Sequence, residues 1–248
     1  MKLCLKVIFL IAFFITVYGC VNAQKFKEVK IGNQVWMAEN LNVFYFRNGD
    51  PIPIVKSDED WVNAGKNKQP ACCYLKNSSV NGVKYGLLYN WYALNDARGL
   101  APVGWNLPSD QDWANLFNFL DRDSLSGINL KSQVGWDSYS GETNCKNCKK
   151  WSPSIKAGKV CPICKDTRKV KANLSGNGKN DFGFTGLPGG TRTDHPDINL
   201  DKRYCFWWSA SDYNTEMASA IGLGYIEDFV YKDKFEKWFG FYVRCVKQ

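Results

Sequence analysis

The N-terminal segment constrains the fold most, because it decides where the rest of the chain must fold. Lys2 and Lys6 supply positive charge, and residues 7–17 that follow carry no charge at all. A short charged region followed by an apolar stretch of this length is typical of a signal peptide. The stretch is too short for a membrane span, which needs about 20 apolar residues. The sequence therefore predicts export from the bacterial cytoplasm, so that the mature chain folds in the cell envelope or outside the cell.

Two cleavage sites are compatible with this segment, and the residues leave both open. Val21-Asn22-Ala23 places small residues before Gln24, which gives a signal peptide of residues 1–23. Val17-Tyr18-Gly19-Cys20 resembles a lipobox, although Tyr18 is large for its position. Cleavage there would leave residues 1–19 as the signal and a lipid on Cys20, which would tether the domain to a membrane leaflet.

The mature chain, residues 24–248, has the length of a single domain with one basic insert. The whole chain has a net charge of +8, and residues 145–171 alone contain nine Lys or Arg and only one acid. We therefore separate a nearly neutral domain from a cysteine-rich basic insert at 143–171. The insert could bind anionic lipid or nucleic acid. We favour a solvated loop and do not expect nucleic acid as a partner.

Four cysteines in the insert form the sharpest motif of the chain: Cys145, Cys148, Cys161 and Cys164. Two Cys-x-x-Cys turns can present four thiolates to one tetrahedral zinc ion. Four cysteine ligands leave no open position, so such a zinc knuckle would be structural and not catalytic. Two disulfides remain an alternative because exported proteins meet an oxidising environment. Thiol–disulfide redox chemistry is a third reading.

The other mature cysteines suggest at most one further cross-link. Cys205 and Cys245 both lie in the strand-rich C-terminal part, and we consider a disulfide between them possible. Cys72 and Cys73 are adjacent and are not expected to bridge each other without strain.

Helix signals come mainly early in the chain and strand signals come mainly late. Residues 29–37 read as a hairpin around Gly32-Asn33. Ser57 and Ser109 are expected to cap helices, the first ending at Gly65. In the second helix one apolar stripe consists of Trp113, Leu116, Phe117 and Leu120. Expected strands lie at 206–208, 221–225 and 239–246. The fold class that follows is α+β.

Few residues could support catalysis. The one histidine of the chain, His195, lies in a turn-forming Asp-His-Pro-Asp stretch. No nucleophile elbow, zinc-protease motif or phosphate loop occurs. Asp110 and Asp112 are explained better by helix capping than by glycosidase chemistry. Trp and Tyr near the late strands could stack on sugar rings, but we expect them to belong to the hydrophobic core. We therefore predict that the protein is not an enzyme.

Several longer motifs resemble one known family, the Fibrobacter succinogenes major paralogous domain. They lie, in order, at residues 31–42, 85–93, 99–109, 187–190 and 240–246. The resemblance covers residues 27–247, nearly all of the mature chain. This family occurs on exported proteins and lipoproteins of Bacteroidetes and Fibrobacter, and its molecular function is not established. The resemblance therefore implies a place in the envelope and says little about the ligand.

A fainter similarity links the chain to formylglycine-generating enzymes. It rests on the segment 106–113, on Gly189-Gly190 and on the ending around Val243-Arg244. Those enzymes have a C-type-lectin-like fold, which implies that a first strand within 27–37 pairs with a last strand within 239–246. Their copper-binding cysteine pair has no counterpart here, because Cys205 and Cys245 are far apart in the sequence. A shared fold does not transfer function.

These observations predict a non-catalytic binding module of the envelope or the cell exterior that recognises a glycan or an envelope protein. One alternative is an enzyme related to the formylglycine-generating oxidases, with copper between Cys205 and Cys245. The other is an adaptor whose basic insert binds anionic lipid or nucleic acid. Any membrane contact of the favoured form would come through the lipid anchor at Cys20.

Overall fold

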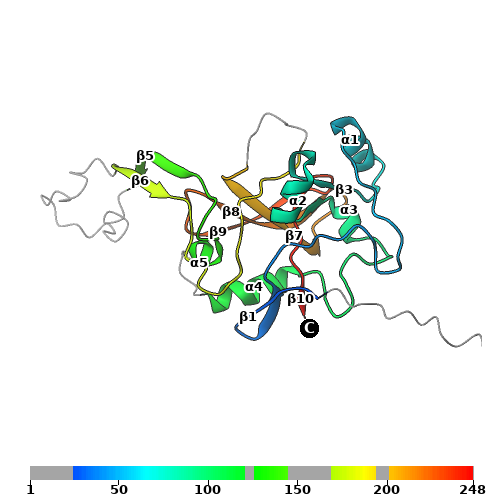
Figure 1. The fold of residues 1–248 in the computed structure, drawn as a ribbon, viewed down its shortest axis with the longest axis horizontal. Coiled ribbons are helices and arrows are strands. Elements are labelled where there is room, and N and C mark those ends of the chain that lie inside the picture. The colour runs from blue at the N-terminus through cyan, green and yellow to red at the C-terminus, as the bar shows by residue number, and fades with distance from the viewer. Residues whose placement is uncertain (1–24, 121–125, 145–168, 194–200, 248) are drawn as a thin grey trace, which may run out of the picture.

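The computed structural model describes residues 25–120, 126–144, 169–193 and 201–247 (Figure 1). Helices and antiparallel sheets are mixed, so the predicted α+β class is confirmed. In chain order the elements are β1 (Glu28–Ile31), β2 (Gln34–Met37), α1 (Asp58–Lys66), β3 (Cys72–Tyr74), η1 (Leu75–Asn77), α2 (Ser79–Tyr85), β4 (Leu87–Tyr89), α3 (Trp91–Leu94), α4 (Asp110–Phe119), α5 (Ser126–Leu130), β5 (Ser138–Asn144), β6 (Lys169–Ser175), β7 (Tyr204–Asp212), β8 (Met217–Gly224), β9 (Val230–Glu236) and β10 (Val246–Lys247).

The two ends of the described chain meet in one small sheet. β1 and β2 form the predicted hairpin, and Gly32 supplies the positive φ of 61° that its tight turn requires. β10 then pairs antiparallel with β2, with Val246 opposite Trp36. Figure 1 shows the C-terminus ending beside this hairpin. The expected pairing of the first and last strands is therefore confirmed.

A three-stranded antiparallel sheet, β7-β8-β9, forms the largest sheet among the described residues. On one face of this sheet, aromatic rings from β7 and β9 lie over Gly222 and Gly224 of β8. A Cβ at Gly222 would lie 2.4 Å from the ring of Phe206, so only glycine allows this ring to cover the strand. Trp207 and Trp208 of β7 are 1% and 0% exposed, which confirms their expected core role. β5 and β6 form a two-stranded arm that projects from the body (Figure 1).

The predicted helix caps are present. The Ser57 side chain accepts a hydrogen bond from the backbone N–H of Asp60, and Ser109 forms a reciprocal capping box with Asp112. The first helix runs one residue past Gly65, which lies inside its last turn. A Cβ there would lie 2.4 Å from the Cβ of Trp238, so this glycine permits close packing and does not end the helix.

The C-terminal segment 239–246 differs from the single strand that its pattern predicts. It is extended, but its backbone hydrogen bonds go to several segments in turn. Gly240 bonds with Arg192, Phe241 with Tyr89, and Tyr242 with β7, before the chain joins β2. No single strand runs alongside the segment. It passes between several of them instead, across the middle of the molecule. This course places Arg244 at the centre of the fold.

The buried residues form two hydrophobic clusters on either side of this crossing segment. The larger one contains Trp36, Trp61, Trp113 and Trp207. The second contains Trp208, Tyr89 and Phe241.

Within the described ranges, no helix is long and apolar enough to cross a bilayer.

Candidate ligand pocket

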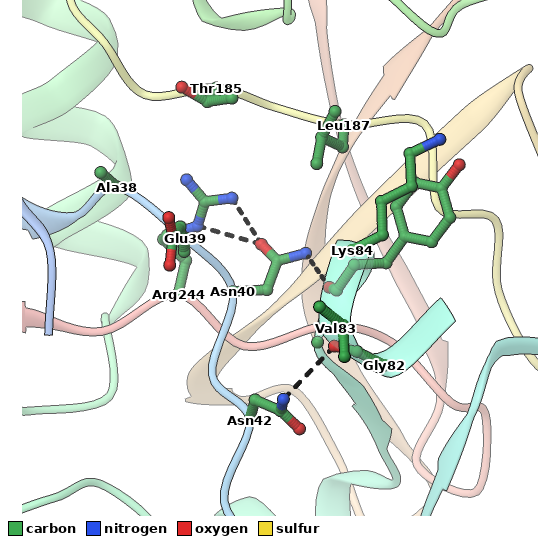
Figure 2. Close-up of a pocket in the computed structure, with 12 residues that line it drawn as sticks. Ala38, Glu39, Asn40, Asn42, Gly82, Val83, Lys84, Thr185, Leu187 and Arg244 are labelled. Atoms are coloured by element: carbon green, nitrogen blue, oxygen red, sulfur yellow. Dashed lines mark hydrogen bonds between the residues drawn. The ribbon is translucent and has the colours of Figure 1, made fainter. Parts of the chain in front are cut away.

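A pocket of about 210 Å³ opens where four separate chain segments meet (Figure 2). One wall is the segment that follows β2, and the opposite wall is the second half of α2 with Gly86. Residues 185–187 pass over the pocket, and Arg244 comes from the crossing C-terminal segment. The full lining consists of Ala38, Glu39, Asn40, Asn42, Gly82, Val83, Lys84, Tyr85, Gly86, Thr185, Leu187 and Arg244.

Most of this lining comes from the sequence motifs that carry the family resemblance. The motif at 31–42 contributes Asn40 and Asn42, and the motif that begins at Tyr85 contributes the end of α2. The motif at 187–190 contributes Leu187, and the ending at 240–246 contributes Arg244. None of these residues was predicted as a site from its own chemistry. The signal that could have revealed them is that the motifs converge in space, which only the fold shows.

Arg244 forms the polar floor of the pocket and is 1% exposed. Its Nε and Nη2 donate to the Oδ1 of Asn40, at 3.0 and 2.5 Å. Its Nη1 donates to the carbonyl oxygens of Phe184 and Met37. The guanidinium carbon also lies 4.3 Å from the ring centroid of Phe184. The cation is therefore held by neutral acceptors and an aromatic face.

No carboxylate within the described ranges is hydrogen-bonded or ion-paired to Arg244. Burial lowers the pKa of the guanidinium to about 10, because burial disfavours the charged form. The group is still a cation at neutral pH, since this value remains well above 7. Among the described residues no carboxylate contacts this buried cation, and the charge of the exposed Glu39 acts on it only from the rim, so the floor of the pocket keeps a positive potential.

Asn40 joins three of the four segments. Besides Arg244, its Oδ1 accepts a hydrogen bond of 2.7 Å from the indole Nε1 of Trp207. Its Nδ2 donates to the carbonyl oxygen of Tyr85 at 2.7 Å. Figure 2 shows this amide between the guanidinium and α2. Asn40 therefore positions Arg244 as well as lining the pocket.

The wall and the rim add both hydrogen-bond acceptors and charges. Asn42 donates to the carbonyl oxygen of Gly82 at 3.3 Å, and its buried Oδ1 has no partner in the described part of the chain. This oxygen is a buried acceptor that lacks a donor among the described residues, so a ligand hydroxyl that reached it through a small movement of Asn42 would satisfy it. At the rim, Lys84 lies 4.7 Å above the ring of Tyr85, and the exposed Glu39 pairs with Lys27 at 3.7 Å.

The Cys205–Cys245 disulfide that the sequence left possible is not formed in the structure, where both thiols are free and buried. Trp207 pairs in parallel with Tyr242. Cys205 lies before Trp207 in the sequence, and Cys245 lies after Tyr242. In a parallel pair these two offsets add, so about five residues of extended chain, roughly 16 Å, separate the cysteines. A disulfide needs Cα atoms within about 7 Å.

The other two described cysteines are also free and buried. Burial is the main cause that raises the pKa of Cys72 to about 12 and that of Cys73 to about 11. A thiol with a raised pKa is a poor nucleophile because the thiolate is the reactive form. Neither residue lines the pocket.

The two acids that were assigned to capping have structural partners. Asp112 closes the capping box of α4, and the Oδ2 of Asp110 lies 3.0 Å from the Nζ of Lys232.

In the ranges that the structure describes, no group of three or more His, Cys, Asp or Glu side chains could hold a metal ion. The signal segment with Cys20, the turn of His195, and Cys145, Cys148, Cys161 and Cys164 lie outside those ranges.

Comparison with known proteins places the chain at the level of a family. No curated protein and no solved structure matches it. The model of the Fibrobacter succinogenes major domain matches residues 29–247, which include every segment of the pocket. The chain therefore belongs to the Fibrobacter succinogenes major domain family.

Proposed function

We propose that this protein is a non-catalytic binding module of the cell envelope or cell exterior, and that it holds one sugar residue of a glycan in the pocket at Arg244. The observation that carries the proposal is the chemistry of the pocket. It combines a buried cationic donor with the unpartnered amide oxygen of Asn42. A sugar hydroxyl is both a donor and an acceptor, so it can satisfy both kinds of group.

The composition of the lining supports binding and not catalysis. It contains no Cys, His or Ser, and Glu39 is its one acid. Lys84, Tyr85 and Thr185 also carry groups that can act in acid–base or nucleophilic chemistry, but among the described residues no hydrogen bond joins any of them to Glu39 or to one another, as a coupled catalytic pair requires. The pocket instead resembles recognition sites in which a few convergent polar groups orient a small ligand.

The proposal extends to the features that lie outside the described residues. The export signal motivates an envelope location, with a lipid on Cys20 or a cut after Ala23. We also propose a C-type-lectin-like arrangement, which the pairing of β2 with β10 supports.

The insert is proposed to be a structural zinc knuckle held by Cys145, Cys148, Cys161 and Cys164. Purified from the periplasm, the chain is then expected to contain one zinc per molecule, with four thiols that react only after chelation. Metal analysis and thiol titration of the same sample check this. A sample without metal and without reactive insert thiols would show two disulfides instead.

Blocking the mouth of the pocket is expected to weaken glycan binding strongly. Val83 is 89% exposed and lines the pocket, so Val83→Trp places an indole at its opening without disturbing the core. A glycan array identifies a ligand for the unmodified chain, and calorimetry then measures its affinity. We expect Val83→Trp to weaken binding at least about tenfold, which corresponds to about 1.4 kcal/mol.

Val80→Trp is the matched control, because Val80 lies on the same helix, is 75% exposed and does not line the pocket. This variant should bind as the unmodified chain does. Equal losses in both variants would place the glycan elsewhere. An array without hits, together with specific capture of one envelope protein, would replace the glycan by a protein partner.

A further inference from the structure

The charges around the pocket are unbalanced in the direction that favours an anion. Arg244 and Lys84 are cations, while Glu39 is the one acid of the lining and is already paired with Lys27. Glu39 is also 71% exposed, so solvent screens its charge, whereas Arg244 is almost fully buried. The positive potential at the floor is therefore screened less than the negative charge at the rim.

Arg244 also keeps hydrogen-bonding capacity. A guanidinium has five N–H donors. Four hydrogen bonds lead from Arg244 to described residues, and Nη2 makes one of them. The second N–H on Nη2 thus has no acceptor among the described residues, and a ligand on the pocket floor could supply one. Folding has already removed the guanidinium from water, so a carboxylate that enters adds only its own desolvation and gains a charge-assisted hydrogen bond.

We propose that the pocket selects a uronic acid residue, with its carboxylate at Arg244 and Lys84 and its hydroxyl groups at Asn42. This inference rests on the proposed glycan-binding function of the same pocket and names the class of sugar. The unpartnered Oδ1 of Asn42 needs a donor, which an ionised carboxylate lacks and a ring hydroxyl supplies. The mixture of cation and acceptor therefore favours an acidic sugar over a simple carboxylic acid.

Two ligands that differ only at C6 test the proposal: methyl glucuronide, which carries a carboxylate, and methyl glucoside, which carries a hydroxymethyl group. Binding to the full mature chain is measured by calorimetry at low salt. The glucuronide is expected to bind at least about tenfold more tightly, with an advantage that shrinks in higher salt. An N-acetyl amino acid, which has a carboxylate and no sugar ring, should bind weakly.

Charge variants at the rim locate the effect in the pocket. Lys84→Gln should weaken glucuronide binding about threefold, and Glu39→Gln should strengthen it by a similar factor, with little change for the glucoside. The exposed residues Lys66 and Glu59 of α1 do not belong to the lining, so Lys66→Gln and Glu59→Gln serve as matched controls.

The outcomes separate this inference from the proposed function. Equal affinity for glucuronide and glucoside, lost in Val83→Trp, would overturn the uronic acid and leave glycan binding in place. Equal affinity for the N-acetyl amino acid would overturn the sugar as the source of the carboxylate. Glucuronide binding that ignores Lys84 and Glu39 would move the site elsewhere. Binding of none of the three would overturn the inference, and an empty glycan array would also remove the proposed function.

Discussion

Asn40→Ala is expected to lower the free energy of unfolding by about 3–5 kcal/mol, because it leaves a buried cation without its main acceptor. The Asn40 Oδ1 accepts two hydrogen bonds from Arg244 and one from Trp207, and the amide also bonds to the carbonyl of Tyr85. Alanine makes none of these bonds. Urea unfolding of the variant and of the unmodified chain measures the difference.

Asn48→Ala is the control for this loss. Asn48 is an exposed asparagine whose side-chain hydrogen bonds within the described residues reach Asp50 alone, so its removal should change stability by less than about 0.5 kcal/mol. A loss below about 1 kcal/mol in Asn40→Ala would contradict the account, since Arg244 would then have alternative acceptors. Destabilisation of both variants to the same degree would show that the effect is not specific to the pocket.

Raising the pH from 8 to 10 is expected to destabilise the fold by roughly 5 kcal/mol, through its four buried thiols. Burial is the main cause that raises the pKa of Cys72, Cys205 and Cys245 to about 12 and that of Cys73 to about 11, from 9.0. In the unfolded chain these thiols ionise near pH 9, while in the folded chain they stay protonated. The stability that protonated thiols contribute is thus fully present below pH 9 and is lost as the pH rises towards 11–12.

Each thiol reduces stability by about 1.4 kcal/mol in total between pH 8 and 10, because the unfolded chain ionises only from about pH 9, and four thiols together give roughly 5 kcal/mol. Arg244 acts in the opposite sense, because its lowered pKa of about 10 lets the folded chain release a proton before the unfolded chain does. This offset is small at pH 10. The expected signature is a steep alkaline loss of stability that begins near pH 9.

Cys72→Ala isolates the cause of the alkaline loss. The variant is less stable at neutral pH because it loses a buried side chain, but its stability should fall less steeply between pH 9 and 10.5, by about one thiol's share. Urea unfolding at several pH values provides both curves. An unchanged slope in Cys72→Ala, or a flat curve from pH 8 to 10, would be incompatible with buried protonated thiols.

Local signals in the sequence predicted the parts of the fold that depend on neighbouring residues. The turn at Gly32 and the caps at Ser57 and Ser109 were read correctly, because a turn or a cap is decided within a few residues. The buried stripe around Trp113 and Leu116 followed from helical spacing alone. The pairing of the chain ends came from the family resemblance and not from local chemistry.

Features that depend on distant packing were misread or missed. Gly65 was expected to end α1, but it makes room for Trp238, which lies far away in the sequence. Segment 239–246 has the alternation of a strand, yet its partners change from residue to residue. Cys205 and Cys245 were considered as a pair because both lie in the late strands, and strand content does not fix register. The pocket likewise depends on four segments that are distant in the sequence and meet only in the fold, so no single segment predicts it.

The most direct test of the pocket uses the tryptophan indole signals of the ¹⁵N-labelled chain, titrated with methyl glucuronide and with the best ligand from the array. The indole N–H of Trp207 donates to Asn40 beside Arg244, so the account predicts that its signal shifts with ligand. The indoles of Trp61 and Trp91 donate to the carbonyls of Trp238 and Ser209, outside the lining, and should stay fixed. A bound ligand that shifts the signals of Trp61 or Trp91 and leaves that of Trp207 unmoved would contradict a ligand site at Arg244.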